Sequence, residues 1–192
     1  INLKDLIYVG LIITTAMPAG ISIVFLSDIV GGEPHKALII TTLAHLISPL
    51  ISPFLIWLFA HKIISIDFIS MIMLIGKLII IPLILAQLFR FFKKEKILSV
   101  IGDNLNLILL FLLTWSSIAL ARAPILSNLN QFIISALIIL FLLIIITILC
   151  IWFGRNQSEK ITWIVAGTFK NVTLASVITI TIFGPVAMMG VA

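Results

Sequence analysis

Two apolar stretches of membrane-spanning length are each interrupted near the middle. The first covers residues 6–30 and is interrupted by Met-Pro-Ala-Gly at 17–20, and the second runs from residue 161 to the end and is interrupted by Thr-Phe-Lys-Asn at 168–171. Lipid cannot satisfy the amides and carbonyls of unwound backbone, so such a break persists only where it lines a protein-enclosed or wet cavity. A pair of interrupted segments is the best sequence indication of the ligand site of a secondary transporter.

The composition is that of a bilayer protein. Hydrophobic residues make up 62% of the chain and charged residues only 10%, against about 25% charged in soluble domains. Spans of about 20 residues can be placed at 6–30, 37–60, 68–88, 97–120, 132–153 and 161 to the end. The sequence therefore predicts an all-α membrane protein with six transmembrane segments in a single domain, residues 1–192. The net charge of +5 lies mostly in short loops, which does not favour a nucleic-acid partner.

The loop charges predict the orientation. Loops 31–36, 90–96 and 154–160 fall on one face and carry seven basic residues: Lys36, Arg90, Lys93, Lys94, Lys96, Arg155 and Lys160. The opposite face carries three: Lys4, Lys62 and Arg122. The positive-inside rule makes the first face cytoplasmic, in a plasma or inner membrane. The two interrupted segments then run antiparallel, as inverted-topology repeats require.

The sequence begins at Ile1 and closes on Gly190-Val191-Ala192 within an apolar run. We expect it to be an internal fragment of a longer membrane protein.

Several motifs together resemble the bile acid:sodium symporter family. They are Pro18-Ala19-Gly20-Ile21-Ser22, Thr41-Thr42, Ser48-Pro49, Lys77 with Pro82, Asn171-Val172-Thr173-Leu174-Ala175 and Phe183-Gly184-Pro185. The resemblance implies ten helices in two inverted repeats, of which this chain holds six, with the first and last discontinuous and crossing. It also implies a core domain (here 1–60 and 131–192), a panel domain (68–121), and transport of organic anions such as bile acids, commonly with sodium.

The chain departs from that family at the positions that hold sodium. A Ser-Asn pair of the family is replaced here by Ile23 and Val24, a Glu by Ala166, and a Gln by Lys170. Sodium needs several oxygen ligands, one of them anionic, and these side chains do not supply them. The sequence therefore does not favour sodium coupling.

An unpaired ammonium at mid-bilayer costs roughly 2.5–3.5 kcal/mol on translocon scales. Three arrangements would reduce this cost for Lys170: it pairs with a carboxylate, it deprotonates, or it attracts an anionic substrate. Our hypothesis is that its ammonium replaces the bound cation, with coupling then absent or carried by protons. The alternative is that Lys170 snorkels or fixes the core electrostatically without touching substrate.

The candidate site contains Lys170 and Asn171 as charge and amide contacts. The candidate hydroxyl groups are those of Thr168, Thr173, Ser22, Thr41 and Thr42, and Pro18, Ala19 and Gly20 hold the first break. His45 is either a proton-linked group or a hydrogen-bonded core histidine.

The predicted function is secondary transport of a small organic anion by alternating access, not sodium-coupled in the usual family way. One alternative is an auxin-efflux-type or other uncoupled carrier on the same scaffold, and another is a membrane sensor that binds a ligand without moving it. Metalloprotease, hydrolase and phosphate-loop motifs are missing from the sequence, as is a Cys/His cluster. We therefore expect no enzyme, metal site or cofactor.

Overall fold

The computed structural model describes residues 2–92 and 95–191. In chain order it contains α1 (Leu3–Ala16), α2 (Ile23–Ile29), α3 (Pro34–Ala60), α4 (Phe68–Phe91), α5 (Glu95–Ser127), α6 (Leu129–Phe153), α7 (Gln157–Thr168), α8 (Val172–Phe183) and a closing 3-10 helix, η1 (Pro185–Gly190). Pairing of extended backbone in these residues is limited to one isolated bridge between Ala19 and Lys170. The predicted all-α class is confirmed.

The helical backbone stops at Ala16 and resumes at Ile23. Met17, the residue after α1, is extended with φ −72° and ψ 149°. A residue before proline is pushed away from the helical region, and Pro18 itself has no N–H to continue a helix. The backbone therefore leaves the helix where the sequence places its first interruption.

The second interruption lies between α7 and α8, at residues 169–171. Asn171 begins α8 as its N-cap, and its side chain accepts a hydrogen bond from the amide of Leu174. At its other end α8 stops before Gly184, whose φ is 79°, a conformation that glycine adopts readily. Pro185 follows, so the apolar run from residue 161 does not continue as one helix to the chain end.

Three helices of the described residues are both long and apolar enough to cross a bilayer: α3 with 27 residues, α4 with 24 and α6 with 25. α5 is longer, at 33 residues. The helices α3 to α6 contain the second to fifth predicted spans and extend a few residues beyond most of their ends. These lengths establish an integral membrane protein, whereas the full set of six spans stays a prediction.

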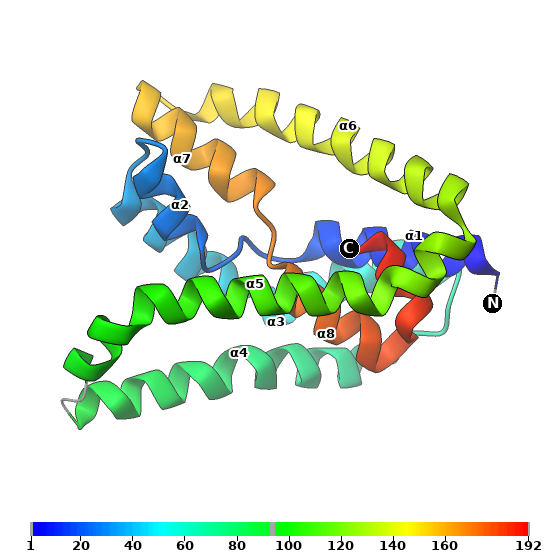
Figure 1. Cartoon of the computed structure of the whole chain (residues 1–192), viewed down its shortest axis with the longest axis horizontal. Helices are drawn as coiled ribbons and strands as arrows, with labels where there is room; N and C mark the ends of the chain where they lie inside the picture. The colour runs from blue at the N-terminus through cyan, green and yellow to red at the C-terminus, as the bar shows by residue number, and fades with distance from the viewer. Residues whose placement is uncertain (1, 93–94, 192) are drawn as a thin grey trace.

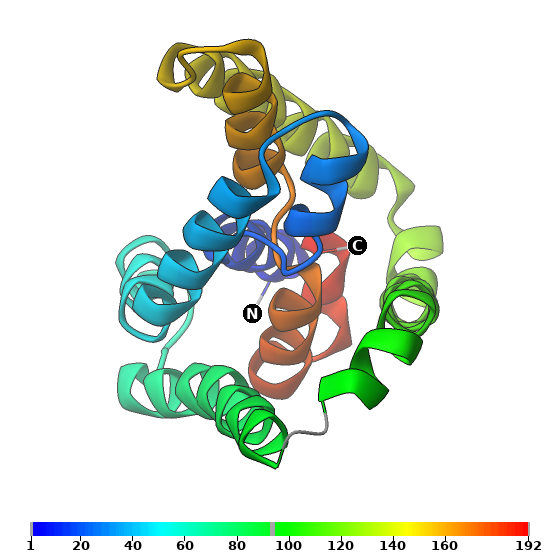
Figure 2. The same cartoon turned by 90° about the vertical axis from the view of Figure 1, so that its left-hand side faces the viewer.

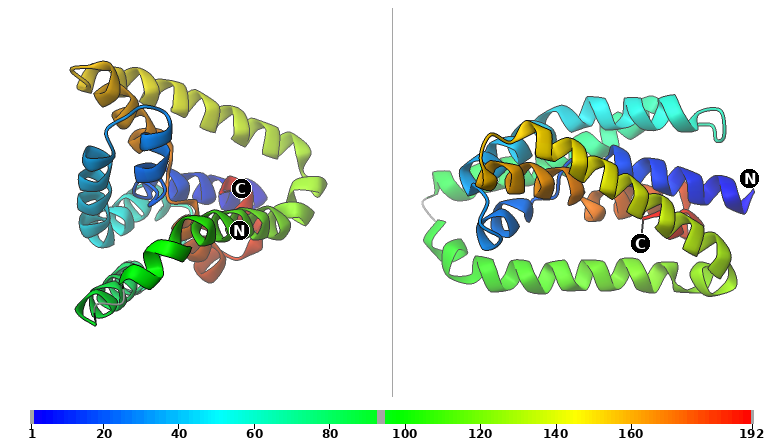
Figure 3. Two further views of the ribbon diagram at one scale, coloured as in Figure 1. Left: turned by 60° about the vertical axis from the view of Figure 1, so that its left-hand side comes forward. Right: turned by 90° about the horizontal axis from the view of Figure 1, so that it is seen from above.

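The interrupted segments lie in the middle of the molecule. α2 and α7 lie together at one end, and α1, α8 and η1 lie toward the other, so both breaks fall between (Figure 1). Viewed along the long axis, the α1–α2 and α7–α8 connections meet near the centre (Figure 2). Seen from above, α3 and α5 flank these segments on opposite sides (Figure 3). The fold therefore surrounds the two breaks with helices.

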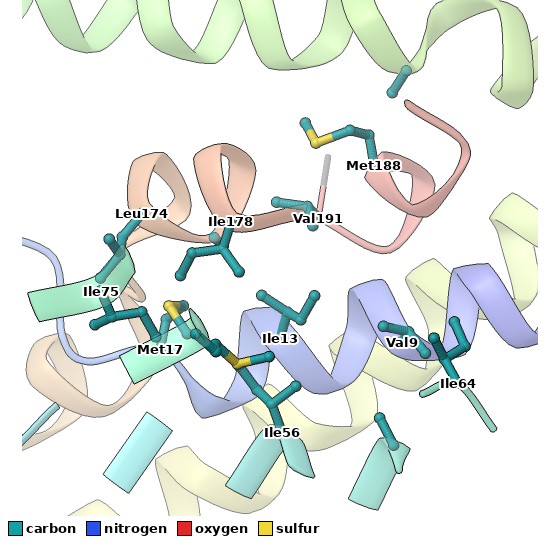
Figure 4. Packing of buried hydrophobic residues seen from close by; sticks show 14 of the residues in the cluster. Val9, Ile13, Met17, Ile56, Ile64, Ile75, Leu174, Ile178, Met188 and Val191 are labelled. Carbon is teal, nitrogen blue, oxygen red and sulfur yellow. The ribbon is translucent and has the colours of Figure 1, made fainter. Parts of the chain in front are cut away.

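A buried apolar cluster holds the α1–α8 end together. Figure 4 shows Val9 and Ile13 of α1 packed near Ile56 of α3 and Ile178 of α8. Each of these four side chains is fully buried, and burial of such a side chain contributes about 1.5–3 kcal/mol. This cluster fixes the half-helices from which the breaks emerge.

α6 has the opposite character. Its sequence is almost entirely apolar, yet only 6% of its most apolar window is buried. Leu137, Phe141 and Ile144 are all more than half exposed. So large an apolar surface is untenable in water and fits the hydrocarbon of a bilayer.

Candidate functional site

The two breaks pair with each other through their backbones. We call residues 17–22 and 169–171 together the crossing. The amide of Gly20 donates to the carbonyl of Phe169 at 2.8 Å, and the amide of Asn171 donates to the carbonyl of Pro18 at 2.8 Å. These bonds form the antiparallel bridge between Ala19 and Lys170. Lipid could not form hydrogen bonds with the amides and carbonyls of this extended backbone, and the bridge provides some of those hydrogen bonds within the protein.

The crossing needs a residue without a side chain at position 20. A Cβ placed on Gly20 would lie 3.3 Å from the carbonyl oxygen of Lys170. That separation is tighter than most Cβ contacts, so a larger side chain would push the two segments apart. Gly20 therefore permits their close approach.

The Lys170 side chain leaves the bridge on the same side as Ala19, because directly opposed residues of an antiparallel pair project together. Ala19 packs in a second buried cluster with Ile23, Val165 and Ala166. Lys170 is half-buried, and no carboxylate of the described residues lies within ion-pair distance of its ammonium. The crossing thus carries one cation beside an apolar cluster.

Asn171 connects the crossing to α3. Its Oδ1 accepts from the Leu174 amide at 3.0 Å, and its Nδ2 lies 3.2 Å from His45 Nε2. His45 Nδ1 in turn lies 2.9 Å from the carbonyl oxygen of Thr41. Asn171 and His45, two of the predicted site residues, are therefore brought into contact from positions 126 residues apart.

The predicted hydroxyl groups fall into two kinds. Thr168 donates to the Ile164 carbonyl at 2.7 Å, Thr41 donates to Ala37 at 2.7 Å, and Thr42 donates to Leu38 at 2.8 Å. Their hydroxyl protons are thus used within their own helices, and Thr42 is exposed.

Ser22 and Thr173 are different. Both are half-buried next to the crossing, and Ser22 makes no cap bond to its helix. Within the described part of the chain, neither hydroxyl has a hydrogen-bond partner. An anion requires donors, so these two hydroxyls are better placed to bind one than the three threonines that bond their own helices.

Ser52 is a contributor that the sequence reasoning missed. Its hydroxyl donates to the carbonyl of Ala16, the last residue of α1, at 2.8 Å, and Ser48 lies 3.0 Å from it. A helix end leaves carbonyls without intrahelical partners, and Ser52 satisfies one beside the crossing. The Ser-Pro pair repeated at 48–49 and 52–53 was the available signal, because residues four apart share a helix face.

The same two prolines alter the backbone of α3. The helix runs unbroken through Pro49 and Pro53, but neither has an N–H to donate. The carbonyl of His45, four residues before Pro49, thereby loses its α-helical donor. The His45 carbonyl oxygen therefore faces the next turn of α3, where Pro49 offers it no N–H.

Helix ends add to the electrostatics of the crossing. α7 ends at Thr168, so its carbonyl end points toward the crossing, and Lys170 lies two residues beyond it. α8 begins after its N-cap Asn171, so Lys170 stands between the negative end of α7 and the positive end of α8. The two helix ends therefore act on its charge with opposite signs.

A second contact joins the outer ends of the same elements. The Lys36 ammonium lies 3.0 Å from Glu33 and 3.0 Å from Glu159, and Asn156 lies 3.5 Å from Glu33. We call these four residues the ion-pair cluster. Next to it, Thr162 accepts from the Glu33 amide at 2.7 Å. The cluster ties the α2–α3 connection to the start of α7.

The charges of the ion-pair cluster stabilise one another. Hydrogen bonds to Glu33 and then Glu159 raise the pKa of Lys36 above its ordinary value. The Arg155 amide, followed by Lys36, lowers the pKa of the Glu159 carboxyl. Sequence reasoning had used Lys36 only for orientation and missed this cluster, although Asn156 and Glu159 have the spacing of a helix capping box.

No group of three or more His, Cys, Asp or Glu side chains in the described ranges could hold a metal ion. The polar groups near the crossing are one ammonium, amides, an imidazole and hydroxyls. This set can bind an anion or pass a proton.

Comparison with known proteins identifies the family of this chain. No curated protein matches the chain. The sequence model of the SBF-like CPA transporter family matches residues 1–192, which agrees with the resemblance to bile acid:sodium symporters. The chain therefore belongs to the SBF-like CPA transporter family, a family of secondary transporters.

Proposed function

We propose that this chain forms the ligand-binding part of a secondary transporter that moves a small organic anion by alternating access. In this proposal the chain makes six membrane spans, with α1–α2 and α7–α8 as two discontinuous, crossing helices of a ten-helix inverted-repeat fold. Residues 1–60 and 131–192 belong to the moving core, and residues 68–121 belong to the panel. Loops 31–36, 90–96 and 154–160 face the cytoplasm.

One observation carries this proposal: Lys170 stands at the bridge between the two breaks without a carboxylate partner in the described residues. Intramembrane charges are costly and are functional by default. An ammonium that no acid neutralises retains its attraction for a soluble anion. Asn171, Ser22 and Thr173 are the polar neighbours that would orient the anion.

The same surroundings argue against the sodium coupling common in the family. Sodium requires an oxygen cage, whereas Ala19, Ile23 and Ala166 surround this side of the bridge with apolar groups. Lys170 supplies the positive charge that a bound cation would otherwise bring. In this proposal the Lys170 ammonium takes the place of a bound sodium ion.

The test is uptake of radiolabelled cholate, as a probe organic anion, into proteoliposomes that contain the complete protein. Uptake is measured with sodium and with sodium replaced by choline. We expect equal flux in both media, at least about tenfold lower flux for Lys170→Gln (a change of about 1.4 kcal/mol), and partial retention for Lys170→Arg.

Lys62→Gln is the matched control, because Lys62 is an exposed lysine outside the helices. It should transport as the native protein does. Strict sodium dependence would overturn the sodium-independent mechanism. Saturable cholate binding without flux at any imposed gradient would instead identify a membrane sensor.

A further inference from the structure

A chain of three hydrogen bonds runs from the middle of α3 to the first turn of α8. His45 Nδ1 lies 2.9 Å from the Thr41 carbonyl, and His45 Nε2 lies 3.2 Å from Asn171 Nδ2. Asn171 Oδ1 accepts from the Leu174 amide at 3.0 Å. The protonation state of the His45 ring is thereby connected, through Asn171, to the N-cap of α8.

The donors and acceptors of this chain can be assigned from its two ends. A carbonyl only accepts, so Thr41 requires a proton on His45 Nδ1. An amide N–H only donates, so Leu174 requires the oxygen of Asn171 to face it, which leaves the Asn171 NH₂ group facing His45. His45 Nε2 must then be the acceptor. All three bonds are satisfied by a neutral imidazole with its proton on Nδ1.

A proton on His45 Nε2 would reverse one of these roles. The nitrogen would become a donor that faces the Asn171 NH₂ group, which also donates. The Asn171 amide could meet it only by turning its oxygen toward His45, and the Leu174 amide would then lose its cap. With His45 protonated, the Asn171 amide can therefore keep its bond to His45 or its N-cap bond from Leu174, but not both.

The charge of the proton also matters. The ring contacts Asn171, so a charged His45 places a cation on the α3 side of the crossing. That cation favours an anion there, and the displaced Asn171 amide becomes free to contact it. Proton binding and anion binding at the crossing would thus reinforce each other.

We propose that His45 is the residue at which a proton from water binds during transport, so that the anion moves together with a proton. The inference rests on the proposed function and names its coupling ion. Binding forms an N–H bond at His45 Nε2, and release returns the same proton to water on the other side.

Other titratable groups are placed less favourably for this task. Four helices pack against α3: α1, α2, α4 and α7. α1 carries Lys4, Asp5 and Tyr8 near its start, and α2 carries Asp28 near its far end. α4 carries Lys77 and Arg90, and α7 carries Glu159 and Lys160 in its first turn. Lys77 is exposed at mid-helix. None of these groups forms a hydrogen bond or ion pair with His45 in the residues that the structure describes, where the partners of the ring are the Thr41 carbonyl and the Asn171 amide.

The first experiment does not depend on transport. Hydrogen exchange of the Leu174 amide is measured in the complete protein at about pH 5.5 and about pH 8, on either side of the value of about 6.5 for an ordinary histidine, and corrected for the intrinsic exchange rate. We expect protection to fall about fivefold at the acidic pH, the effect of losing an N-cap.

The variant is His45→Gln, whose amide can accept from Asn171 but does not titrate. Its Leu174 protection should not change with pH. The matched control is His61→Gln, because His61 makes the same bond to the carbonyl four residues back, at 2.8 Å to Trp57, but lies at the far end of α3. It should retain the native pH dependence. Two results would overturn the proposal: Leu174 protection that does not vary with pH in the native protein, or a native pH dependence that persists in His45→Gln.

The second experiment measures cholate flux together with internal acidification, using pyranine trapped in sodium-free proteoliposomes. We expect an imposed inward proton gradient to raise cholate uptake several-fold in the native protein and in His61→Gln, and to have no effect in His45→Gln. Cholate flux that does not respond to the gradient would overturn proton coupling. A pH-dependent Leu174 amide in a protein without flux for any anion would overturn the proposed function and leave the His45–Asn171 switch standing.

Discussion

The crossing and the ion-pair cluster join the same parts of the molecule in opposite ways. At the cluster, one ammonium is shared by two carboxylates, each at 3.0 Å. At the crossing, two backbone hydrogen bonds of 2.8 Å hold the segments together, and the one ammonium has no acid partner in the described residues. The charges of the ion-pair cluster balance one another within the protein, whereas no described carboxylate balances the charge of Lys170. That contrast is the strongest reason to regard Lys170 as a ligand contact.

The largest effect is expected when the crossing is forced apart. In Gly20→Val the added carbons would meet the Lys170 carbonyl, so we expect about 2 kcal/mol of destabilisation from overpacking and loss of cholate flux. Thermal denaturation in detergent and proteoliposome uptake would measure both. Gly76→Ala is the control, because nothing lies within 4 Å of a Cβ on Gly76, and it should behave as native.

The next largest effect should follow from giving the crossing the acid that the ion-pair cluster has. Ala166 is buried in the same cluster as Ala19, on the side to which Lys170 projects. A carboxylate in Ala166→Glu would pair with the ammonium, and we expect anion flux to fall about tenfold (about 1.4 kcal/mol). Ala166→Gln, which is similar in size but uncharged, should lose less. Equal losses in the two variants would show that volume, not charge, is responsible.

A moderate effect is expected from the bond that supports the end of α1. Ser52→Ala leaves the Ala16 carbonyl without its donor, which should cost about 1–2 kcal/mol for a poorly solvated acceptor. The melting temperature in detergent reports this loss. Ser127→Ala, which removes an exposed hydroxyl bonded only to carbonyls of its own helix turn and to the adjacent Asn128, should leave the melting temperature unchanged. A native melting temperature for Ser52→Ala would mean that water replaces the hydroxyl at α1.

The smallest effect is expected at the ion-pair cluster, because exposed ion pairs contribute little. Lys36→Gln should lower the melting temperature by about 2 °C and leave cholate flux intact. The Glu159 pKa is lowered, so its contribution is present above the ordinary carboxyl value of 4.5 and is lost as the pH falls below it. The Lys36 pKa is raised, so its contribution is present below 10.5 and is lost at higher pH.

The melting-temperature difference between native protein and Lys36→Gln should therefore be largest between these limits and vanish in acid. It should also shrink as salt is added, because exposed charges are screened. A difference that persists at low pH would show that Lys36 acts through packing of its stem and not through its charge.

Local backbone chemistry made the breaks predictable. Pro18 with Gly20 two residues later, and a Lys-Asn pair amid apolar residues, indicated the two interruptions. Proline alone does not decide a break, because α3 runs unbroken through Pro49 and Pro53. The pairing of Ala19 with Lys170 depends on how distant segments meet, and no residue type encodes a single backbone bridge. The contact of His45 with Asn171 had the same limitation, since either residue alone has many potential partners.

Side-chain geometry was harder to predict than position. Thr168, Thr41 and Thr42 were chosen for their hydroxyls, but each donates to a carbonyl of its own helix. The ion-pair cluster was missed because Glu33 and Glu159 lie far apart in sequence and only its basic member, Lys36, was used, as a loop charge. The threonine bonds follow from local helix geometry, whereas the contacts of the ion-pair cluster depend on the tertiary fold.

Pro49 also has a consequence for the polarity of α3. By removing the helical donor of the His45 carbonyl, it leaves an acceptor at mid-depth that acyl chains cannot serve. A donor from a neighbouring side chain, a local adjustment of the backbone or a water molecule has to serve that oxygen. The central part of α3 therefore presents polar backbone where the rest of the helix is apolar.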